Sequence, residues 1–481
     1  MQRLVMESTG QEHSETSRTE SRAESHVLMK AIRSYGRFSM VALLGLVSII
    51  PLLIVGDVAS EREGYFHQAE NEVANTWGLP QLVTGPVLVV PVDYVEKPPQ
   101  DGWRAENYKP LRTRKQVIVL PDTLDIDADV THETRKRAIY EIALFSVDLR
   151  ASGVFESPRA RVEAHLSSVA GYNTVVDWEG VRLVVGVIDP RAIRLGASLG
   201  ASTTQPQSNQ PLSWNGSAVE FAPGEYQDLL NHSIQAQVDL PADKENAAFH
   251  LRLGLGTTKS FVINALGGTS SYSLKSSWPH PSFTGDHLPV RRAISASGFS
   301  ADWEVHGLAR NLPDLWVHQD QQRTLTNGQM GVKFHNPVTP YTSIDRGIKY
   351  GLLFIALTFL TFFCVELITK AKFHVVQYAV VSLGLIMFYM TLLAASEHMV
   401  FSLSYALATG LITALLGAYS WGMTREKLIT SLIVGVLLGL YGTLFVLLKL
   451  EDFALLTGTA LLLIALAALM FATRNLHRAG E

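Results

Sequence analysis

Long uncharged runs of apolar residues constrain this chain more than any other feature of its sequence. Five of them lie at approximately 350–368, 375–395, 399–420, 428–448 and 453–472, and a sixth covers 38–56. About 20 consecutive apolar residues are enough for a helix to cross the hydrocarbon core of a bilayer. The sequence therefore predicts a membrane protein with an N-terminal transmembrane helix and a C-terminal bundle of five transmembrane helices, over 350–472.

The distribution of Lys and Arg predicts how these spans are oriented. Basic residues precede the first span, recur at alternate connections of the bundle and follow its last helix: Lys30, Arg33, Arg37, Lys370, Lys372, Arg425, Lys427, Arg474 and Arg478. Because cytoplasmic connections carry an excess of Lys and Arg, both terminal tails, 1–37 and 473–481, are expected in the cytoplasm. Arg346 and Lys349 are local exceptions. The tail 1–37 has no apolar periodicity, so we expect it to be disordered.

A cleaved signal peptide is the alternative interpretation of 38–56. Its apolar core would be unusually long, and no clear small-residue cleavage site follows it. We therefore interpret this segment as an anchor, with a kink at Pro51.

Residues 57–349 have the composition of a water-exposed domain. The orientation of the first span places this domain on the outer side of the membrane. A helix is expected near 59–77. Short β-branched runs bounded by turn residues then recur: GPVLVVPVDYVE, KQVIVLP, EIALFSVDL, VRLVVGVI, SIQAQVDLP, HLRLGL and KSFVINA. This pattern is typical of a sandwich or barrel, so the sequence predicts a large, predominantly β, sandwich-like periplasmic domain.

Charge and cysteine content exclude several classes of partner and cofactor. The net charge is −4 and the chain has no basic arm, which argues against nucleic-acid binding. The single cysteine, Cys364, lies within an apolar run, so the chain can form neither an internal disulfide nor a cysteine–zinc site. GLGTTKS resembles a phosphate-binding loop, but Thr258 stands where that loop needs glycine. We expect no cofactor.

The stretch SWPHPSFTGDHLP, residues 277–289, combines aromatic rings, prolines and histidines. Proline excludes a helix interior or a central strand here. We interpret the stretch as a rigid loop between strands, with Trp278 and Phe283 as buried anchors. His280, Asp286 and His287 could instead be metal ligands, but the prolines prevent a regular helix from aligning the two histidines.

Polar residues near the bundle connections are candidate functional groups. Glu366 lies near the inner end of its span, and His374, Gln377 and Tyr378 begin the next one. An ionisable group inside a span is costly and by default suggests a partner or a function. Glu366 and His374 could meet on the cytoplasmic side, or Glu366 could pair with Lys370 on the same helix face.

Glu397 and His398 form a second polar pair, in a short outer connection. The simplest interpretation is a solvated link between two helices.

Three separated blocks closely resemble the CreD family of bacterial inner-membrane proteins: SSWPHPSFTGDHLPVRRAISASGFSADWEV, DRGIKYGLLFIALTFLTFFCVELI and HVVQYAVVSLGLIMFYMTLLAASEH. The resemblance implies a multi-pass protein of the inner membrane that supports cell-envelope integrity, under two-component control as part of a stress response. It supplies no reaction. The long N-terminal tail and the final HRAGE depart from the family pattern, but neither affects these blocks.

Three classes of function are compatible with these observations. The first is a non-enzymatic envelope protein whose periplasmic domain binds a periplasmic or cell-wall component. The second is a transporter or channel that uses Glu366, His374 and Glu397 within the membrane. The third is a metal-dependent membrane hydrolase, for which the chain has no HExxH motif. We favour the first class; the sequence does not indicate an oligomeric state.

Overall fold

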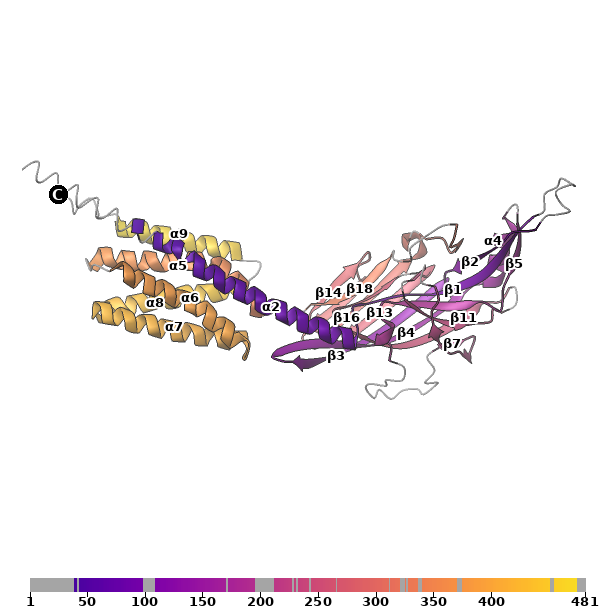
Figure 1. Cartoon of the computed structure of the whole chain (residues 1–481), viewed down its shortest axis with the longest axis horizontal. Helices are drawn as coiled ribbons and strands as arrows, with labels where there is room; N and C mark the ends of the chain where they lie inside the picture. The colour runs from indigo at the N-terminus through magenta and orange to yellow at the C-terminus, as the bar shows by residue number, and fades with distance from the viewer. Residues whose placement is uncertain are drawn as a thin grey trace, which may run out of the picture. The chain divides into compact units, whose positions relative to one another are not determined.

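The computed structural model describes residues 39–473 apart from 41–42, 98–108, 170–171, 195–211, 227–228, 231, 242–243, 265, 311, 321–324, 326–327, 336–339, 370–373 and 450–453. The two predicted tails therefore lie almost wholly outside the described residues. The chain divides into two compact units (Figure 1). The helical unit comprises Met1–Phe66 with Val338–Glu481, and the β unit comprises His67–Pro337.

Long helices build the helical unit: α2 (Ile49–Trp77), which continues into the β unit, α5 (Pro340–Thr369), α6 (Val375–Ser396), α7 (Phe401–Thr424), α8 (Lys427–Lys449) and α9 (Ala454–Thr473). Within the described residues, five helices are long and apolar enough to cross a membrane: Leu43–Trp77, Tyr341–Glu366, Val375–Ser396, Phe401–Thr424 and Lys427–Lys449. The sequence of α9 contains no charged residue. The apolar runs therefore predicted these helices.

Two boundaries differ from those expected from hydropathy. Residues 340–349, which the sequence assigned to the β-rich domain, are the first turns of α5. The first span and the helix expected near 59–77 are not separate, because α2 runs without a break from Ile49 to Trp77. A turn at Ser48, three residues before Pro51, interrupts the helix that precedes it. Proline has no N–H to donate to the residue four positions earlier, which accounts for an interruption at this point.

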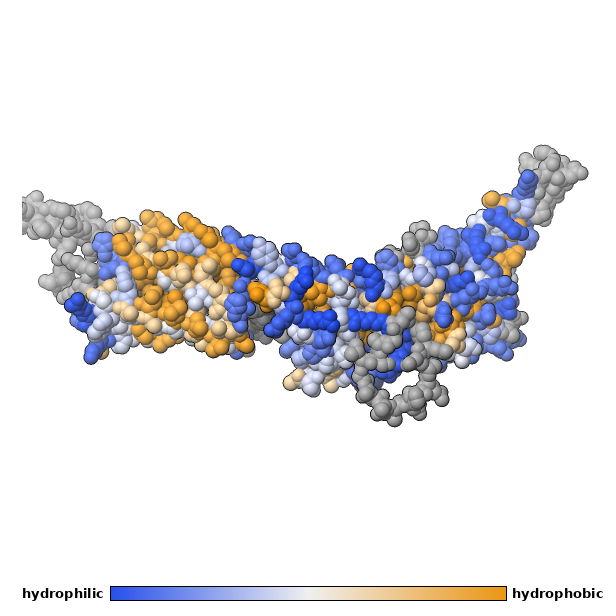
Figure 2. Space-filling view, turned by 60° about the horizontal axis from the view of Figure 1, so that its bottom comes forward, coloured by the Kyte–Doolittle hydropathy of each residue, from blue (hydrophilic) through white to orange (hydrophobic). Residues whose placement is uncertain are grey.

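The surface of the helical unit is apolar around its sides. Figure 2 shows hydrophobic residues covering its flank between more polar ends. On α7, for example, Leu403, Leu407, Leu411 and Leu415 follow one another at a spacing of four residues and are all exposed. Residues four apart lie on one helix face, so this row of leucines is suited to contact lipid.

Two packed sheets make up the β unit. The ten-stranded sheet contains β1 (Gln81–Glu96), β2 (Arg112–Val119), β5 (Tyr172–Val176), β6 (Arg182–Val187), β9 (Ala222–Pro223), β10 (Ser233–Gln237), β12 (Ser260–Asn264), β14 (Pro281–Gly285), β17 (Leu315–Val317) and β18 (Gln329–Phe334). Its main path runs β14-β18-β12-β1-β6-β10-β9, with β2 and β5 paired to β1 and β17 paired to β2.

The eight-stranded sheet has the order β15-β16-β13-β3-β4-β11-β7-β8. Its strands are β3 (Thr123–Arg137), β4 (Tyr140–Phe155), β7 (Leu212–Trp214), β8 (Ser217–Ala218), β11 (Ala247–Thr257), β13 (Thr269–Ser276), β15 (Arg291–Ser295) and β16 (Gly298–His306). Most strand pairs in the two sheets are antiparallel; β1 with β12 and β3 with β13 are parallel. A short helix, α4 (Pro158–Ser167), buries Val162 and Leu166 against the core.

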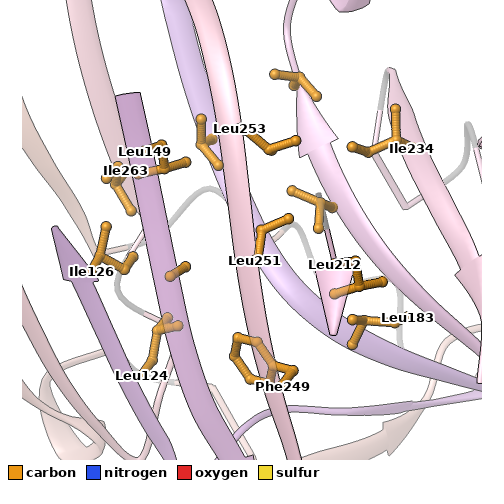
Figure 3. Close-up of a cluster of buried hydrophobic side chains, with 14 of the residues drawn as sticks. Leu124, Ile126, Leu149, Leu183, Leu212, Ile234, Phe249, Leu251, Leu253 and Ile263 are labelled. Atoms are coloured by element: carbon orange, nitrogen blue, oxygen red, sulfur yellow. The ribbon is translucent and has the colours of Figure 1, made fainter. Parts of the chain in front are cut away.

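One continuous hydrophobic core lies between the two sheets. Figure 3 shows Leu124 and Ile126 of β3, Phe249 and Leu251 of β11, and Leu183 of β6 within it. Alternate residues of β3 are buried and exposed along the first half of the strand, as expected where one face of a sheet meets a core and the other meets water. Because the two sheets share this core, the β unit is a single sandwich.

Strand β1 is buried on both faces. Leu88 and Val90 contribute to the core between the sheets, whereas Val87 and Val89 pack with Trp316 in a second cluster on the other side. A strand covered on both sides has a continuous apolar sequence rather than an alternating one, which explains the run PVLVVPV. All seven of the β-branched runs noted in the sequence overlap strands, and the prediction of a large β-rich region is confirmed.

Candidate functional site

Residues 277–289 connect the edges of the two sheets. Pro281–Gly285 form β14, the edge strand of the ten-stranded sheet, and the chain then turns into β15, the edge strand of the eight-stranded sheet. A proline is tolerated as the first residue of an edge strand because its missing N–H interrupts no ladder. The stretch is therefore part strand and part corner, rather than a loop throughout as the sequence suggested.

Both predicted aromatic anchors of this corner are only partly buried, and both pack against the core. The Trp278 ring lies edge-on to Phe145 with their centroids 5.3 Å apart, and its indole nitrogen donates to the His335 carbonyl oxygen at 3.0 Å. The Phe283 ring lies 5.9 Å from the ring of Trp303. These contacts hold the corner to both sheets.

Among the polar side chains of this corner, Asp286 bonds to backbone N–H groups, whereas Nε2 of His287 is buried without a hydrogen-bond partner among the described residues. The Asp286 carboxylate accepts hydrogen bonds from the backbone N–H groups of Gly328 and Gln329, at 2.9 and 3.0 Å. The His287 carbonyl oxygen accepts one from the Trp303 indole at 3.1 Å, and the His280 ring lies 6.1 Å from that of Trp278. Within the described part of the chain, no group of three His, Cys, Asp or Glu residues is placed to hold a metal ion.

An open groove of about 640 Å³ lies beside this corner, where the β15–β16 hairpin meets the middle of β3 and the end of β13. The polar residues lining it are Asp129, Thr131, Lys275, Ser276, Ser277, Ser295, Ser297 and Ser300. Asp129 and Lys275 stand directly opposite each other across the β3–β13 pair. The groove therefore offers several hydroxyl groups together with one carboxylate and one ammonium group.

Gly298 allows the hairpin to approach β13 at the groove. Its φ is +137°, which side chains rarely adopt, and an added Cβ would collide with the Ser276 carbonyl oxygen. Glycine has no Cβ and accepts this conformation without strain. The sequence SASG at 295–298 contains this turn signal, but its serines were not identified as site residues from the sequence.

A serine and a histidine form a hydrogen-bonded pair at the groove. Ser277 Oγ lies 2.7 Å from Nδ1 of His132 on β3. A nucleophilic serine needs a third group that orients the imidazole. Among the described residues, no carboxylate is hydrogen-bonded to the His132 ring. The pair therefore ties the corner to β3 but is not a catalytic triad.

Fixed charges surround Asp129 on the same face of the sheet. Arg150 donates to Asp129 at 3.0 Å and to Asp148 at 3.2 Å, and Arg252 donates to Asp148 at 2.9 and 3.0 Å. Partial burial alone would raise the pKa of Asp148, but the hydrogen bonds and charges of Arg252 and Arg150 outweigh it and lower the pKa. The Asp148 carboxylate thus stays ionised at neutral pH and holds Arg150 and Arg252 in place.

A second, smaller cavity of about 310 Å³ lies near the end of α4, lined by Tyr94 and His165 among others. The Tyr94 hydroxyl is buried and has no hydrogen-bond partner. Burial, and secondarily the negative charge of Asp320, raise the pKa of Tyr94. This cavity offers fewer polar groups than the groove.

In the helical unit, Tyr378 and Glu366 join two helices. The Tyr378 hydroxyl of α6 donates to the Glu366 carboxylate of α5 at 3.1 Å. His374 and Gln377 form a capping box at the start of α6: Nδ1 of His374 accepts from the Val376 N–H at 3.3 Å, and Oε1 of Gln377 accepts from the His374 N–H at 2.7 Å. Both residues thus have a structural role. Lys370, the predicted alternative partner of Glu366, lies outside the described residues.

Glu397 is an ion-pair residue rather than a solvated one. Its Oε1 lies 3.7 Å from Nε of Arg62 on α2, and its side chain is 13% exposed. Its neighbour His398 is exposed, as expected for a helix connection. The pair connects α2 to the α6–α7 turn within the helical unit.

The fold and these sites define a class of protein: an α-helical, multi-span membrane protein that carries a large two-sheet β unit. The chain belongs to the CreD family, because the model of the inner membrane protein CreD matches residues 33–478. It is 30% identical over 447 residues to the inner membrane protein CreD of Escherichia coli (strain K12), covering 91% of this chain and 93% of that protein. The resemblance noted in the sequence is thus confirmed.

Proposed function

We propose that this protein supports the integrity of the bacterial cell envelope without catalysing a reaction. In this proposal the first span is an uncleaved anchor, both termini are cytoplasmic and the β unit is periplasmic. The alternation of Lys and Arg clusters along the chain supports this orientation. Membership of an inner-membrane family and the five membrane-capable helices support the location.

The groove beside the β15–β16 hairpin is the single observation on which a binding function rests. Its serine hydroxyls both donate and accept hydrogen bonds, and Asp129 and Lys275 add opposite charges. Such a lining suits a polar, uncharged or zwitterionic component of the periplasm or cell wall. The Ser277–His132 pair lacks an orienting carboxylate among the described residues, so binding is favoured over hydrolysis.

The transporter and hydrolase alternatives gain no support from the site geometry. His374 and Gln377 cap a helix, and Glu366 bonds to a tyrosine on the neighbouring helix. Within the described residues, no set of metal ligands is present that a metal-dependent hydrolase would require.

Filling the groove tests this proposal. In a strain that lacks the native protein, Ser297→Trp should abolish rescue of sensitivity to detergent and other envelope stress while the protein accumulates normally. The matched control, Ser217→Trp, places the same side chain on an exposed strand at the other edge of the same sheet, and it should rescue fully. If the strain without the protein shows no envelope defect, the envelope role is wrong; full rescue by Ser297→Trp would show that the groove is not the binding site.

A further inference from the structure

Strand β15 is an open edge of the sandwich. It pairs with β16 on one side, and no other described strand pairs with its other side. All five of its residues are exposed. An uncovered edge strand presents unpaired N–H and C=O groups to which another strand can bind.

The register of the hairpin identifies which backbone groups are free. Ser295 stands opposite Gly298 across a two-residue turn, so the backbones of these two residues form both hydrogen bonds with each other. Hydrogen-bonded and non-hydrogen-bonded pairs alternate along an antiparallel ladder, so Ala293–Ser300 and Arg291–Asp302 are hydrogen-bonded pairs as well. The N–H and C=O groups of the intervening residues, Arg292 and Ile294, therefore point away from β16. These groups can bind an added strand.

The side chains at the same two positions are also uncovered. Arg292 and Ile294 stand opposite Ala301 and Phe299, which belong to the core face of β16. Ile294 is nevertheless 53% exposed, and the preceding Leu288 and Val290 are 73% and 63% exposed. The apolar core face of the sheet thus ends at β15 without a cover.

Charge distinguishes the two arginines of this strand. The Arg291 guanidinium lies 3.4 Å from the carboxylates of both Asp302 and Glu304. Arg292 is exposed and forms no ion pair with any residue that the structure describes. Its charge is available to a bound segment.

We propose that β15 binds an extended peptide segment of another envelope protein by strand addition, with an acidic residue opposite Arg292 and apolar residues two positions to either side. Backbone bonds to Arg292 and Ile294 would supply affinity, and the alternating side chains would supply specificity. The inference rests on the proposed function, since it names the partner that an envelope-binding β unit would recognise.

A second copy of β15 is a poor occupant of this edge. Side chains of directly opposite residues in an antiparallel pair point to the same face of the sheet. In a symmetric pair of two β15 strands, one residue must therefore lie opposite its own copy, and this residue is the centre of the pairing. Centring on Arg291 or on Arg292 places two like charges opposite each other, which is destabilising. Centring on Ala293 places the Arg292 guanidinium opposite Ile294. Centring on Ile294 or Ser295 runs the pairing into the turn at 296–297, so that at most three residues of each strand pair. An acidic, apolar partner avoids all three mismatches.

Binding of a designed peptide to the full-length protein in detergent tests this proposal. The probe is a fluorescently labelled heptapeptide with Thr at odd positions and Val, Glu and Val at positions 2, 4 and 6; its control carries Lys in place of Glu. We expect the Glu peptide to bind at least tenfold more tightly. Arg292→Glu should reverse this preference, which a change in folding alone would not do.

Ile294→Pro supplies a second, independent variant. It removes an N–H that faces away from β16, and proline is tolerated on an edge strand. The thermal midpoint should stay unchanged while binding of the Glu peptide falls at least tenfold. The proposal is overturned if both peptides bind equally or if neither binds. It is also overturned if the protein forms concentration-dependent dimers that Ile294→Pro dissociates, because the edge would then bind a second copy of this chain. Ala293, Ile294 and Ser295 also line the groove, whereas Arg292 does not. Failure of the groove is therefore read from envelope rescue by Ser297→Trp, and failure of the edge strand from the peptide preference of Arg292→Glu, so the two are distinguishable.

Discussion

Replacing Trp303, which packs against the proline-rich corner at 277–289, with alanine should strongly destabilise the β unit. Trp303 is 1% exposed. Its ring stacks on Tyr272 with a centroid distance of 4.8 Å and meets the edge of Phe283 at 5.9 Å, while its indole N–H bonds to the His287 carbonyl oxygen. One side chain thus joins β16, β13 and the connection between the two sheet edges.

The expected cost follows from these contacts. Truncating a buried tryptophan to alanine costs about 3–5 kcal/mol because a cavity remains. Loss of the indole hydrogen bond adds about 1 kcal/mol. With a urea m-value of roughly 3 kcal/mol/M for a domain of this size, the unfolding midpoint should fall by about 1–2 M.

Pulse proteolysis of the full-length protein in detergent, across a urea series, measures this midpoint through cleavage of the β unit. Trp303→Phe is the matched control, because it keeps most of the ring and loses the indole N–H; its midpoint should fall by less than half as much. A Trp303→Ala midpoint within about 0.3 M of the wild-type value, on the same m-value, would show that this tryptophan does not hold the corner together.

Four further outcomes are expected. Reporter fusions after Ser213 should read as exported and fusions after Lys427 as cytoplasmic; the opposite pattern would refute the orientation. Glu366→Gln should insert normally and still rescue the envelope defect, because the amide oxygen can accept the hydrogen bond of its tyrosine partner; lost rescue with normal insertion would instead indicate a role for the charge. Tyr94→Phe should leave the urea midpoint unchanged or raise stability by up to about 1 kcal/mol, since it removes a buried hydroxyl without a partner; a lower midpoint would reveal an interaction of that hydroxyl. His280→Ala should accumulate and function normally, and stable but inactive protein would make the corner a functional site.

Helices and strands with a strong local signal could be predicted from the sequence alone. A run of bilayer length such as 375–395 specifies a helix by itself, because the hydrocarbon core demands internal backbone hydrogen bonds. The alternation of apolar and polar residues in HLRLGL predicted a half-buried strand, because successive side chains of a strand point to opposite faces of the sheet. The start of α5 was missed because its first turns are polar, although Pro340 at the first helical position is a known signal. The cap by His374 was missed because histidine is not among the usual capping residues.

Only the tertiary structure decided where the candidate site lies. The groove gathers Asp129 of β3, Lys275 of β13 and Ser297 of the β15–β16 turn, which are far apart in the sequence. Their proximity depends on the parallel pairing of β3 with β13, and sequence patterns report which face of a strand is buried but not which strand lies beside it. The same reasoning applies to Arg292. The sequence places Arg292 two positions from Val290 and Ile294. Only the order of strands in the sheet places its charge on an open edge.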